Sequence, residues 1–230
     1  MDDYLADEGA PAVVRAGIGL LSWEQAAFIA NSKGDTIERT TIRAKVLRDD
    51  MFLIRLVFGC GWSQPARYRR HVKVNVRNLL VGDALGTSPD VTFSWIADGK
   101  IDVMIHFASP PRIGSEIRFM VIMDWPGKCA PLMSEVTDDF AVCFRQQSVE
   151  FVSYKIVLPA GREAYYEPIG FVADDPGFGI DASVNEDGRN QYLFSGTGLQ
   201  VRQRAGIKLE LKGNGKHSSP QQWQATSALR

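Results

Sequence analysis

The sequence predicts an all-β protein made of two consecutive antiparallel β-sandwich domains, preceded by a short helical segment. Many short segments alternate apolar and polar residues with a period of two, turn residues separate them at regular intervals, and almost no helical pattern lies between them. Successive parallel strands would need helical crossovers, for which the spacing leaves no room. The alternative architecture is one continuous large sandwich.

Residues 1–35 are expected to form an N-terminal arm with a short helix at 23–32. Ser22 and Gln25 have the S-x-x-Q spacing of a capping box, and Gly34 stands where a glycine commonly ends a helix. The arm is expected to cover a sheet edge, or to serve in docking or oligomerisation.

The first sandwich is assigned to residues 36–126. Its clearest signal is Asp98-Gly99 between two alternating runs, because a type I′ hairpin turn needs a positive φ at both central residues. The strands expected in this domain are 40–46, 51–58, 72–76, 91–97, 100–107 and 117–121.

The second sandwich is assigned to residues 140–212, after a connection at 127–139 that is indicated by Pro126-Gly127, Pro131 and Asp138-Asp139. Its expected strands are 140–145, 149–158, 169–172, 180–184, 192–195 and 207–211, with a hairpin turn at Asp187-Gly188. Residues 213–230 are polar and are expected to form a flexible tail in which Trp223 is the exception.

The strand rhythm over 36–212 resembles the paired immunoglobulin-like sandwiches seen in many bacterial binding proteins. The resemblance depends on the rhythm and on no motif, since the Cys…Trp…Cys signature of immunoglobulin domains is absent. It implies that loops and strand faces carry out recognition.

Composition excludes few partners. With 26 Lys and Arg against 27 Asp and Glu, the net charge of −1 argues neither for nor against nucleic acid. The three cysteines, Cys60, Cys129 and Cys143, form no CxxC pair, so reduced thiols in a cytoplasmic protein are expected, with one disulfide left open. No apolar run approaches the length of a membrane span, and the acidic start is unlike a secretory signal.

The strongest local anomaly is charge. Residues 51–82 contain no Asp or Glu, and the candidate binding residues in this stretch are Arg67, Tyr68, Arg69, Arg70, His71, Lys73 and Arg77. Strand alternation would place His71, Lys73 and Arg77 on one outward face, which would attract an acidic protein or a small anionic ligand. Nucleic acid is less favoured because aromatic residues for base stacking are sparse there. The alternative is a solvated face whose charges are paired across the sheet with Asp98, Asp102 and Glu116.

Other chemistry has less support. The carboxylates of residues 174–181, with Glu167, do not match the spacing of an EF-hand, so a plain turn is expected rather than a Ca²⁺ site. Residues 61–65 begin like a nucleophile elbow but lack its last glycine. His and Cys lack the paired spacing of zinc ligands. No catalytic residue, metal or cofactor is therefore predicted.

The expected function is a non-enzymatic, cytosolic recognition or sensing module that binds a protein or a small anionic ligand through loops or the basic strand face. One alternative is a structural or assembly subunit of a larger complex, with self-association into a homo-oligomer left open. A second alternative is a hydrolase-type enzyme that uses His71 or His106 with carboxylates.

Overall fold

The computed structural model describes residues 17–80, 84–172 and 174–213, and this part of the chain is nearly all β. Its strands are β1 (Ile18–Ile29), β2 (Thr36–Val46), β3 (Leu53–Gly59), β4 (Lys73–Asn78), β5 (Asp90–Ala97), β6 (Lys100–His106), β7 (Glu116–Trp125), β8 (Asp138–Cys143), β9 (Val149–Val157), β10 (Ala164–Ile169), β11 (Phe178–Val184), β12 (Asn190–Leu199) and β13 (Arg204–Leu211). Two single-turn helices are α1 (Ala66–Arg69) and α2 (Ala130–Met133).

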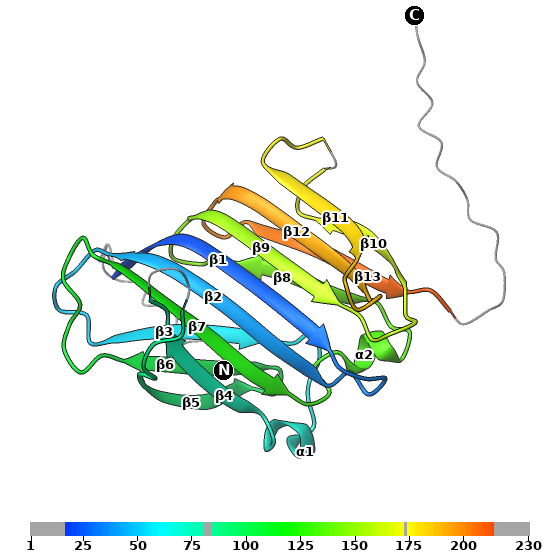
Figure 1. Cartoon of the computed structure of the whole chain (residues 1–230), viewed down its shortest axis with the longest axis horizontal. Coiled ribbons are helices and arrows are strands. Elements are labelled where there is room, and N and C mark those ends of the chain that lie inside the picture. The colour runs from blue at the N-terminus through cyan, green and yellow to red at the C-terminus, as the bar shows by residue number, and fades with distance from the viewer. Residues whose placement is uncertain (1–16, 81–83, 173, 214–230) are drawn as a thin grey trace, which may run out of the picture.

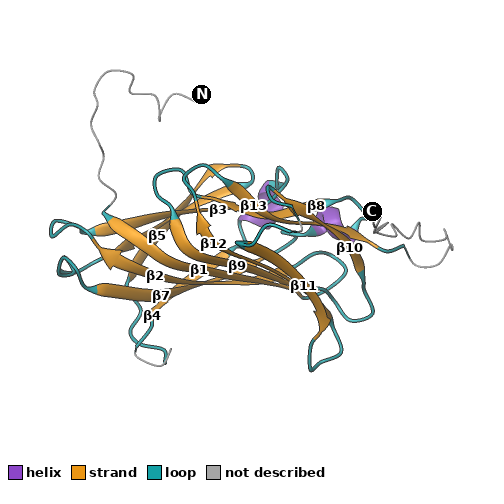
Figure 2. Cartoon of the chain, turned by 90° about the horizontal axis from the view of Figure 1, so that it is seen from above, coloured by secondary structure: helices purple, strands orange, loops and turns teal. Residues whose placement is uncertain are grey.

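The strands form a two-layered sandwich with one large sheet and two small ones. The large sheet has seven strands in the order β11-β12-β9-β1-β2-β7-β4. The second layer consists of two three-stranded sheets, β10-β13-β8 and β3-β6-β5. Figure 1 looks onto the large sheet with the small sheets behind it, and Figure 2 shows the two layers from above.

The all-β class is confirmed, whereas the arrangement as two consecutive immunoglobulin-like sandwiches is not. Strand β1 pairs in parallel with β9, from Leu20 opposite Val149 to Phe28 opposite Val157. The seven-stranded sheet therefore combines strands from 36–126 with strands from 140–212, as the single-sandwich alternative requires. The parallel pair needs no helical crossover because most of the first half of the chain lies between its two strands.

The predicted helix at 23–32 is wrong, since Ile18–Ile29 is a central strand of the large sheet. Trp23, Gln25, Ala27 and Ile29 are all buried and alternate with more exposed neighbours, which is a period of two. In the sequence this alternation is hard to recognise, because the inward residue Gln25 is polar. A register shift between Leu20 and Ser22 interrupts the alternation further.

Both predicted hairpins are confirmed, with Asp98-Gly99 joining β5 to β6 and Asp187-Gly188 joining β11 to β12. The expected type I′ turn at Asp98-Gly99 is wrong, because neither residue has a positive φ and the register shifts between Trp95 and Ala97 just before the turn. The strand expected at 169–172 lies earlier in the chain, as β10 at Ala164–Ile169. Gly170 follows with a φ of +79° and lies so close to the Arg204 carbonyl that a Cβ would clash.

The hydrophobic core fills the space between the layers and continues from one small sheet to the other. Aromatic pairs connect the layers: the Trp95 ring on β5 meets the Trp125 ring on β7 edge-on, with 5.7 Å between centroids. Trp23 of β1 packs against Phe58 of β3 at 5.7 Å. Burying one such large side chain contributes roughly 1.5–3 kcal/mol.

Residues 1–16 of the expected arm and 214–230 of the expected tail, including Trp223, lie outside the described residues. Within the described ranges, we find no helix that is both long enough and apolar enough to cross a membrane.

Candidate functional site

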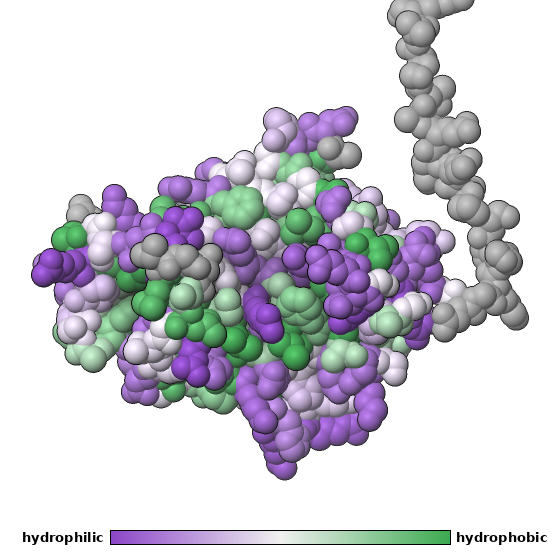
Figure 3. All heavy atoms as spheres, in the orientation of Figure 1, coloured by the Kyte–Doolittle hydropathy of each residue, from purple (hydrophilic) through white to green (hydrophobic). Residues whose placement is uncertain are grey.

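The basic stretch found in the sequence lies at one edge of the molecule. Arg67, Tyr68 and Arg69 are on α1, and Lys73 and Arg77 are on β4, the last strand of the large sheet. This segment lies at the place of the hydrophilic projection at the bottom of Figure 3. A cation on an edge strand also disfavours pairing with another chain's strand, so the location has a structural use as well.

Part of this charge is neutralised as the solvated-face alternative expects. Arg69 forms an ion pair with Asp98 (2.9 Å between Nη1 and Oδ1) and lies over the Trp95 ring. Arg55 pairs with Asp102 at 2.8 Å. The third expected partner, Glu116, pairs instead with Arg43 and Arg118.

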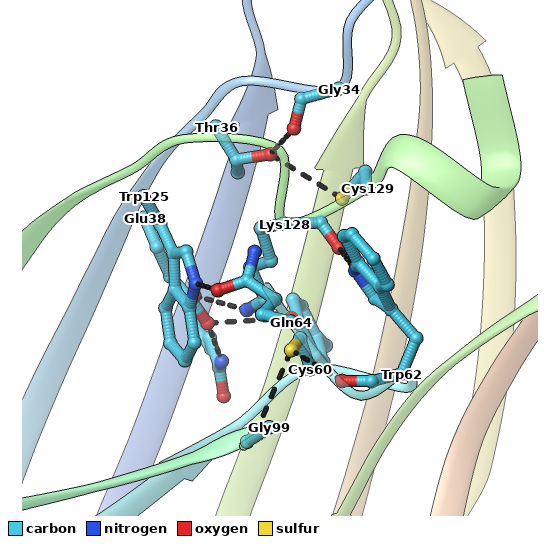
Figure 4. Close-up of polar contacts among 12 residues, drawn as sticks. Gly34, Thr36, Glu38, Cys60, Trp62, Gln64, Gly99, Trp125, Lys128 and Cys129 are labelled. Atoms are coloured by element: carbon cyan, nitrogen blue, oxygen red, sulfur yellow. Dashed lines mark hydrogen bonds and ion pairs between the residues drawn. The ribbon is translucent and has the colours of Figure 1, made fainter. Parts of the chain in front are cut away.

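Tyr68 is a structural contact in this region. Its ring packs edge-on against Trp62, with 6.0 Å between centroids, and lies directly over Gly127, where a Cβ would come within 3.1 Å of Cε1. The indole N–H of Trp62 donates to the Lys128 carbonyl at 3.0 Å (Figure 4). These contacts hold α1 against the loop after β7.

Five residues of the stretch remain available to a partner, and we call them the basic surface: Arg67, Arg70, His71, Lys73 and Arg77. The side chains of Lys73 and Arg77 share the outward face of β4, with Lys73 opposite Asp124 in register. No carboxylate of the described residues lies within ion-pair distance of any of the five. No described carboxylate therefore forms an ion pair with the four Lys and Arg side chains of the basic surface, which leaves them available to an acidic group.

A buried polar cluster, which the sequence did not reveal, lies between the layers. Glu38 of β2 has no exposed surface, and Lys128 donates to its Oε2. Gln25 donates to the other carboxylate oxygen, and the indole N–H of Trp23 donates to Gln25 at 3.0 Å. The Lys128 ammonium also reaches the Tyr154 hydroxyl at 3.4 Å. Burial and the nearby Glu38 carboxylate raise the pKa of Tyr154 well above its ordinary value.

The chain beside this cluster is fixed by polar contacts from the loops. The indole N–H of Trp125 donates to Gln64 Oε1 at 2.7 Å (Figure 4). Gln64 in turn donates to the Pro126 carbonyl at 3.0 Å. The Lys128 ammonium lies 5.0 Å from the centre of the Trp125 ring. The side chains of the cluster bond to one another, and they connect β2 to the loops at 60–65 and 126–129. The role of the cluster is therefore structural.

Asp138 and two thiols are the titratable groups beside the cluster. Burial raises the pKa of Asp138 to about 6, against the opposing effects of the Asp139 N–H and Lys128. Burial likewise raises the pKa of Cys129 to about 12 and raises that of Cys60. Thiols with raised pKa values are poor nucleophiles at neutral pH.

The register places Asp90 opposite His106, but Ser63 forms no hydrogen bond with His71 or His106. Ser63 bonds Asp98 at 3.0 Å, and His106 bonds Thr92 at 2.9 Å. His71 is exposed in the turn between α1 and β4. In the described ranges no group of three or more His, Cys, Asp or Glu side chains is placed to hold a metal ion, and this includes the carboxylates of 174–181.

A cleft of about 350 Å³ opens between the layers at the end opposite the basic surface. Three tyrosines line it: Tyr165 and Tyr166 of β10, which are 54% and 45% exposed, and Tyr192 of β12. The Tyr192 hydroxyl accepts from the Ala164 N–H (2.8 Å) and donates to the Ala164 carbonyl (2.9 Å). A second, smaller hollow shares Tyr165 and Tyr166. In the sequence, the adjacent Tyr165 and Tyr166 are the feature that could have indicated this cleft.

No protein-family model matches the chain, and no curated protein sequence matches it. Among solved structures, it is similar to a putative protease from Parabacteroides distasonis, with a TM-score of 0.52 and 11% identity over 85% of this chain and 40% of that chain. It is also similar to an M1 zinc metallopeptidase from Deinococcus radiodurans, with a TM-score of 0.48 and 10% identity over 84% of this chain and 42% of that chain.

The likeness to the putative protease shows a shared fold alone, since the identity is 11%. The chain spans about two fifths of the length of these solved chains.

Proposed function

We propose that this chain is a non-enzymatic recognition domain that binds a protein partner with acidic side chains through the basic surface. The observation that carries the proposal is the basic surface on and between α1 and β4, where no described carboxylate lies within ion-pair distance and residues 51–82 contain no Asp or Glu. Opposite charges steer encounter and set specificity at protein interfaces.

The chemistry of the surface favours a protein over the other anionic partners. The aromatic residues near it, Tyr68 and Trp62, pack against each other and are not presented for base stacking. Neither the tyrosine-lined cleft nor the smaller hollow includes a residue of the basic surface. The three free cysteines agree with a reducing, cytoplasmic setting.

The test is fluorescence anisotropy with a labelled octapeptide of glutamate at low salt. Arg67→Glu with Lys73→Glu should weaken binding at least about tenfold, because two attractive charges become repulsive. The matched control is Lys33→Glu with Arg145→Glu, which makes the same charge change at positions elsewhere on the surface and should change the Kd by less than about twofold. Equal losses in both double variants, or no binding by the original chain, would contradict the proposal.

A second candidate is the β domain of a larger peptidase, favoured by the likeness to a putative protease of which this chain covers 40%. In that role the chain would supply fold and recognition, and another part of the protein would supply the chemistry. Incubation of the chain with fluorogenic peptide substrates, with and without Zn²⁺, should give no turnover. Turnover that His106→Ala abolishes would contradict both candidates and support the hydrolase alternative.

An assembly subunit is the remaining proposal from the sequence. Light scattering that shows a defined ring or filament would favour it over recognition by a monomer or a dimer.

A further inference from the structure

The edge of the large sheet opposite the basic surface is acidic. Residues 163–188 contain no Lys, Arg or His, and their carboxylates are Glu163, Glu167, Asp174, Asp175, Asp181, Glu186 and Asp187. Glu167 of β10 pairs with Lys208 of β13, and Glu163, just before β10, pairs with Lys212, just after β13. No described cation lies within ion-pair distance of the other five carboxylates. Those five lie before, on and after β11, the last strand at this edge.

The pairing of β11 with β12 shows which of its backbone groups are used. The Thr197 N–H donates to the Gly177 carbonyl, and the Asn185 N–H donates to the Arg189 carbonyl, both at 2.9 Å. Hydrogen-bonded pairs alternate along an antiparallel ladder, so the odd-numbered residues of β11 bond β12. The even-numbered residues direct their N–H and C=O groups away from the sheet.

Three consecutive even-numbered residues of β11 have no partner for these groups among the described residues. The Phe178 N–H donates to the Asp175 carbonyl at 3.1 Å, which closes the beginning of the strand. Ile180, Ala182 and Val184 follow, and no other described residue bonds their backbone. They form a row of donors and acceptors with the spacing of an extended polypeptide (upper edge of Figure 1).

The tyrosine-lined cleft lies directly beside this row. Ala182 and Val184 line it together with Tyr166 and Tyr192, and Val184 is 61% exposed. A strand added to β11 would direct every second side chain to the same side as Ala182 and Val184, into the cleft. The opposing edge strand, β10, has fewer backbone groups for pairing with another strand. The Tyr192 hydroxyl bonds both the N–H and the carbonyl of Ala164, and Pro168 has no N–H.

We infer that the free edge of β11 binds an extended polypeptide segment in which apolar and basic residues alternate. The backbone groups of Ile180, Ala182 and Val184 pair with the segment as an eighth strand, the cleft takes its inward apolar side chains, and the carboxylates around β11 attract its outward Lys or Arg side chains. This binding is independent of the proposed function, since it uses the opposite edge of the sheet and a partner of opposite charge.

A second copy of this chain is a poor occupant. Its basic edge strand, β4, is partly closed, since the Asn78 N–H donates to the Thr87 carbonyl (2.9 Å) and the Gly86 N–H donates to the Asn78 carbonyl (2.7 Å). Pairing β11 with β11 of another copy would bring two Asp181 side chains and two sets of flanking carboxylates together. Like charges facing each other across a ladder are destabilising.

The probe is a labelled, terminally blocked heptapeptide of sequence Lys-Val-Lys-Leu-Lys-Val-Lys, with Glu-Val-Glu-Leu-Glu-Val-Glu as its matched control. Anisotropy should show salt-sensitive binding of the first peptide and at least about tenfold weaker binding of the second. Amide exchange followed by NMR should show at least about tenfold slower exchange at Ile180, Ala182 and Val184 when the first peptide is bound.

Ala182→Pro is the decisive variant because the N–H that it removes is not part of the ladder to β12. It should raise the Kd about tenfold, whereas Ala182→Val, which keeps the N–H, should change it by less than about threefold. Circular dichroism checks that each variant folds. Asp181→Lys, which reverses an exposed charge and removes the acceptor of the Ser183 hydroxyl, is the second variant and should also weaken binding.

Four results would overturn the inference: equal binding of the two peptides, no slowing of exchange on β11, binding unaffected by Ala182→Pro and Asp181→Lys, or light scattering that shows the edge occupied by self-association. The variants Arg67→Glu and Lys73→Glu should leave binding of the lysine peptide unchanged. Failure here and failure of the proposed function are therefore distinguishable.

Discussion

Lys128 and Glu38 form a buried ion pair that joins the loop after β7 to the inner face of β2, with side-chain exposures of 5% and 0%. The two residues are 90 positions apart in the sequence. Gln25 and Tyr154 complete the hydrogen bonding of the carboxylate from β1 and β9. The pair therefore connects three neighbouring strands of the large sheet with the loop that leads to α2.

Removal of one partner should leave a buried charge uncompensated. Lys128→Met is expected to lower the free energy of unfolding by about 3–5 kcal/mol, whereas Lys45→Met, at an exposed position of β2, should change it by less than about 0.5 kcal/mol. Urea unfolding measures both. The double variant with Glu38→Gln should recover part of the loss, and a double variant less stable than Lys128→Met would contradict this account.

Asp138 should make stability depend on pH. Its folded pKa of about 6 lies above the ordinary value of 3.8, so the folded state holds this proton more tightly than the unfolded state. The group's contribution to stability is present below about pH 4 and is lost as the pH rises through about 6, which amounts to roughly 3 kcal/mol.

Asp138→Asn removes this titration and keeps the shape of the side chain. The stability of the original chain minus that of the variant should fall by up to about 3 kcal/mol between pH 4 and pH 7. Chemical unfolding of both proteins at several pH values provides the measurement. A difference that stays constant across this range would show that Asp138 titrates normally.

The three cysteines should differ in reactivity toward a thiol reagent. Cys143 is exposed, whereas Cys129 is buried with a pKa raised to about 12, and burial also raises the pKa of Cys60. At pH 8 one thiol should react quickly, and Cys143→Ser should abolish that phase. Cys129 should react only after unfolding, so modification of Cys129 before Cys143, identified by mass spectrometry, would be inconsistent with this fold.

Two glycines with positive φ give a matched pair. Gly161 (φ +72°) has open space where a Cβ would lie, whereas a Cβ on Gly170 (φ +79°) would collide with the Arg204 carbonyl oxygen. Gly161→Ala should cost about 1–2 kcal/mol through backbone strain alone. Gly170→Ala should cost at least about 2 kcal/mol more, because β10 must move away from β13. Equal losses in thermal unfolding would contradict the close approach.

The predictable stretches are those with one solvent-exposed face, such as the second half of β2, where the inward Ile42, Ala44 and Val46 alternate with the outward Arg43 and Lys45. Strand β1 was missed because Gln25 occupies an inward position and its buried partner, Glu38, belongs to another strand. The parallel pairing of β1 with β9 joins segments from opposite halves of the chain, such as Leu20 and Val149, which no local pattern encodes.

The candidate site was only partly predictable for a related reason. Composition located the basic stretch, but the pairing of Arg69 with Asp98 depends on how α1 lies against the β5–β6 turn. The cleft forms only when Tyr166 of β10 meets Tyr192 of β12, with 5.8 Å between ring centroids, across two different sheets. A composition signal for its acidic surroundings was present in residues 163–188.

The most direct test of the central claim is an NMR titration of the ¹⁵N-labelled chain with the glutamate octapeptide. Recognition through the basic surface predicts that chemical-shift changes concentrate in residues 66–78, that they vanish in Arg67→Glu with Lys73→Glu, and that they persist in Lys33→Glu with Arg145→Glu. Changes spread evenly over exposed cations, or changes centred on the buried cluster around Lys128, would contradict it.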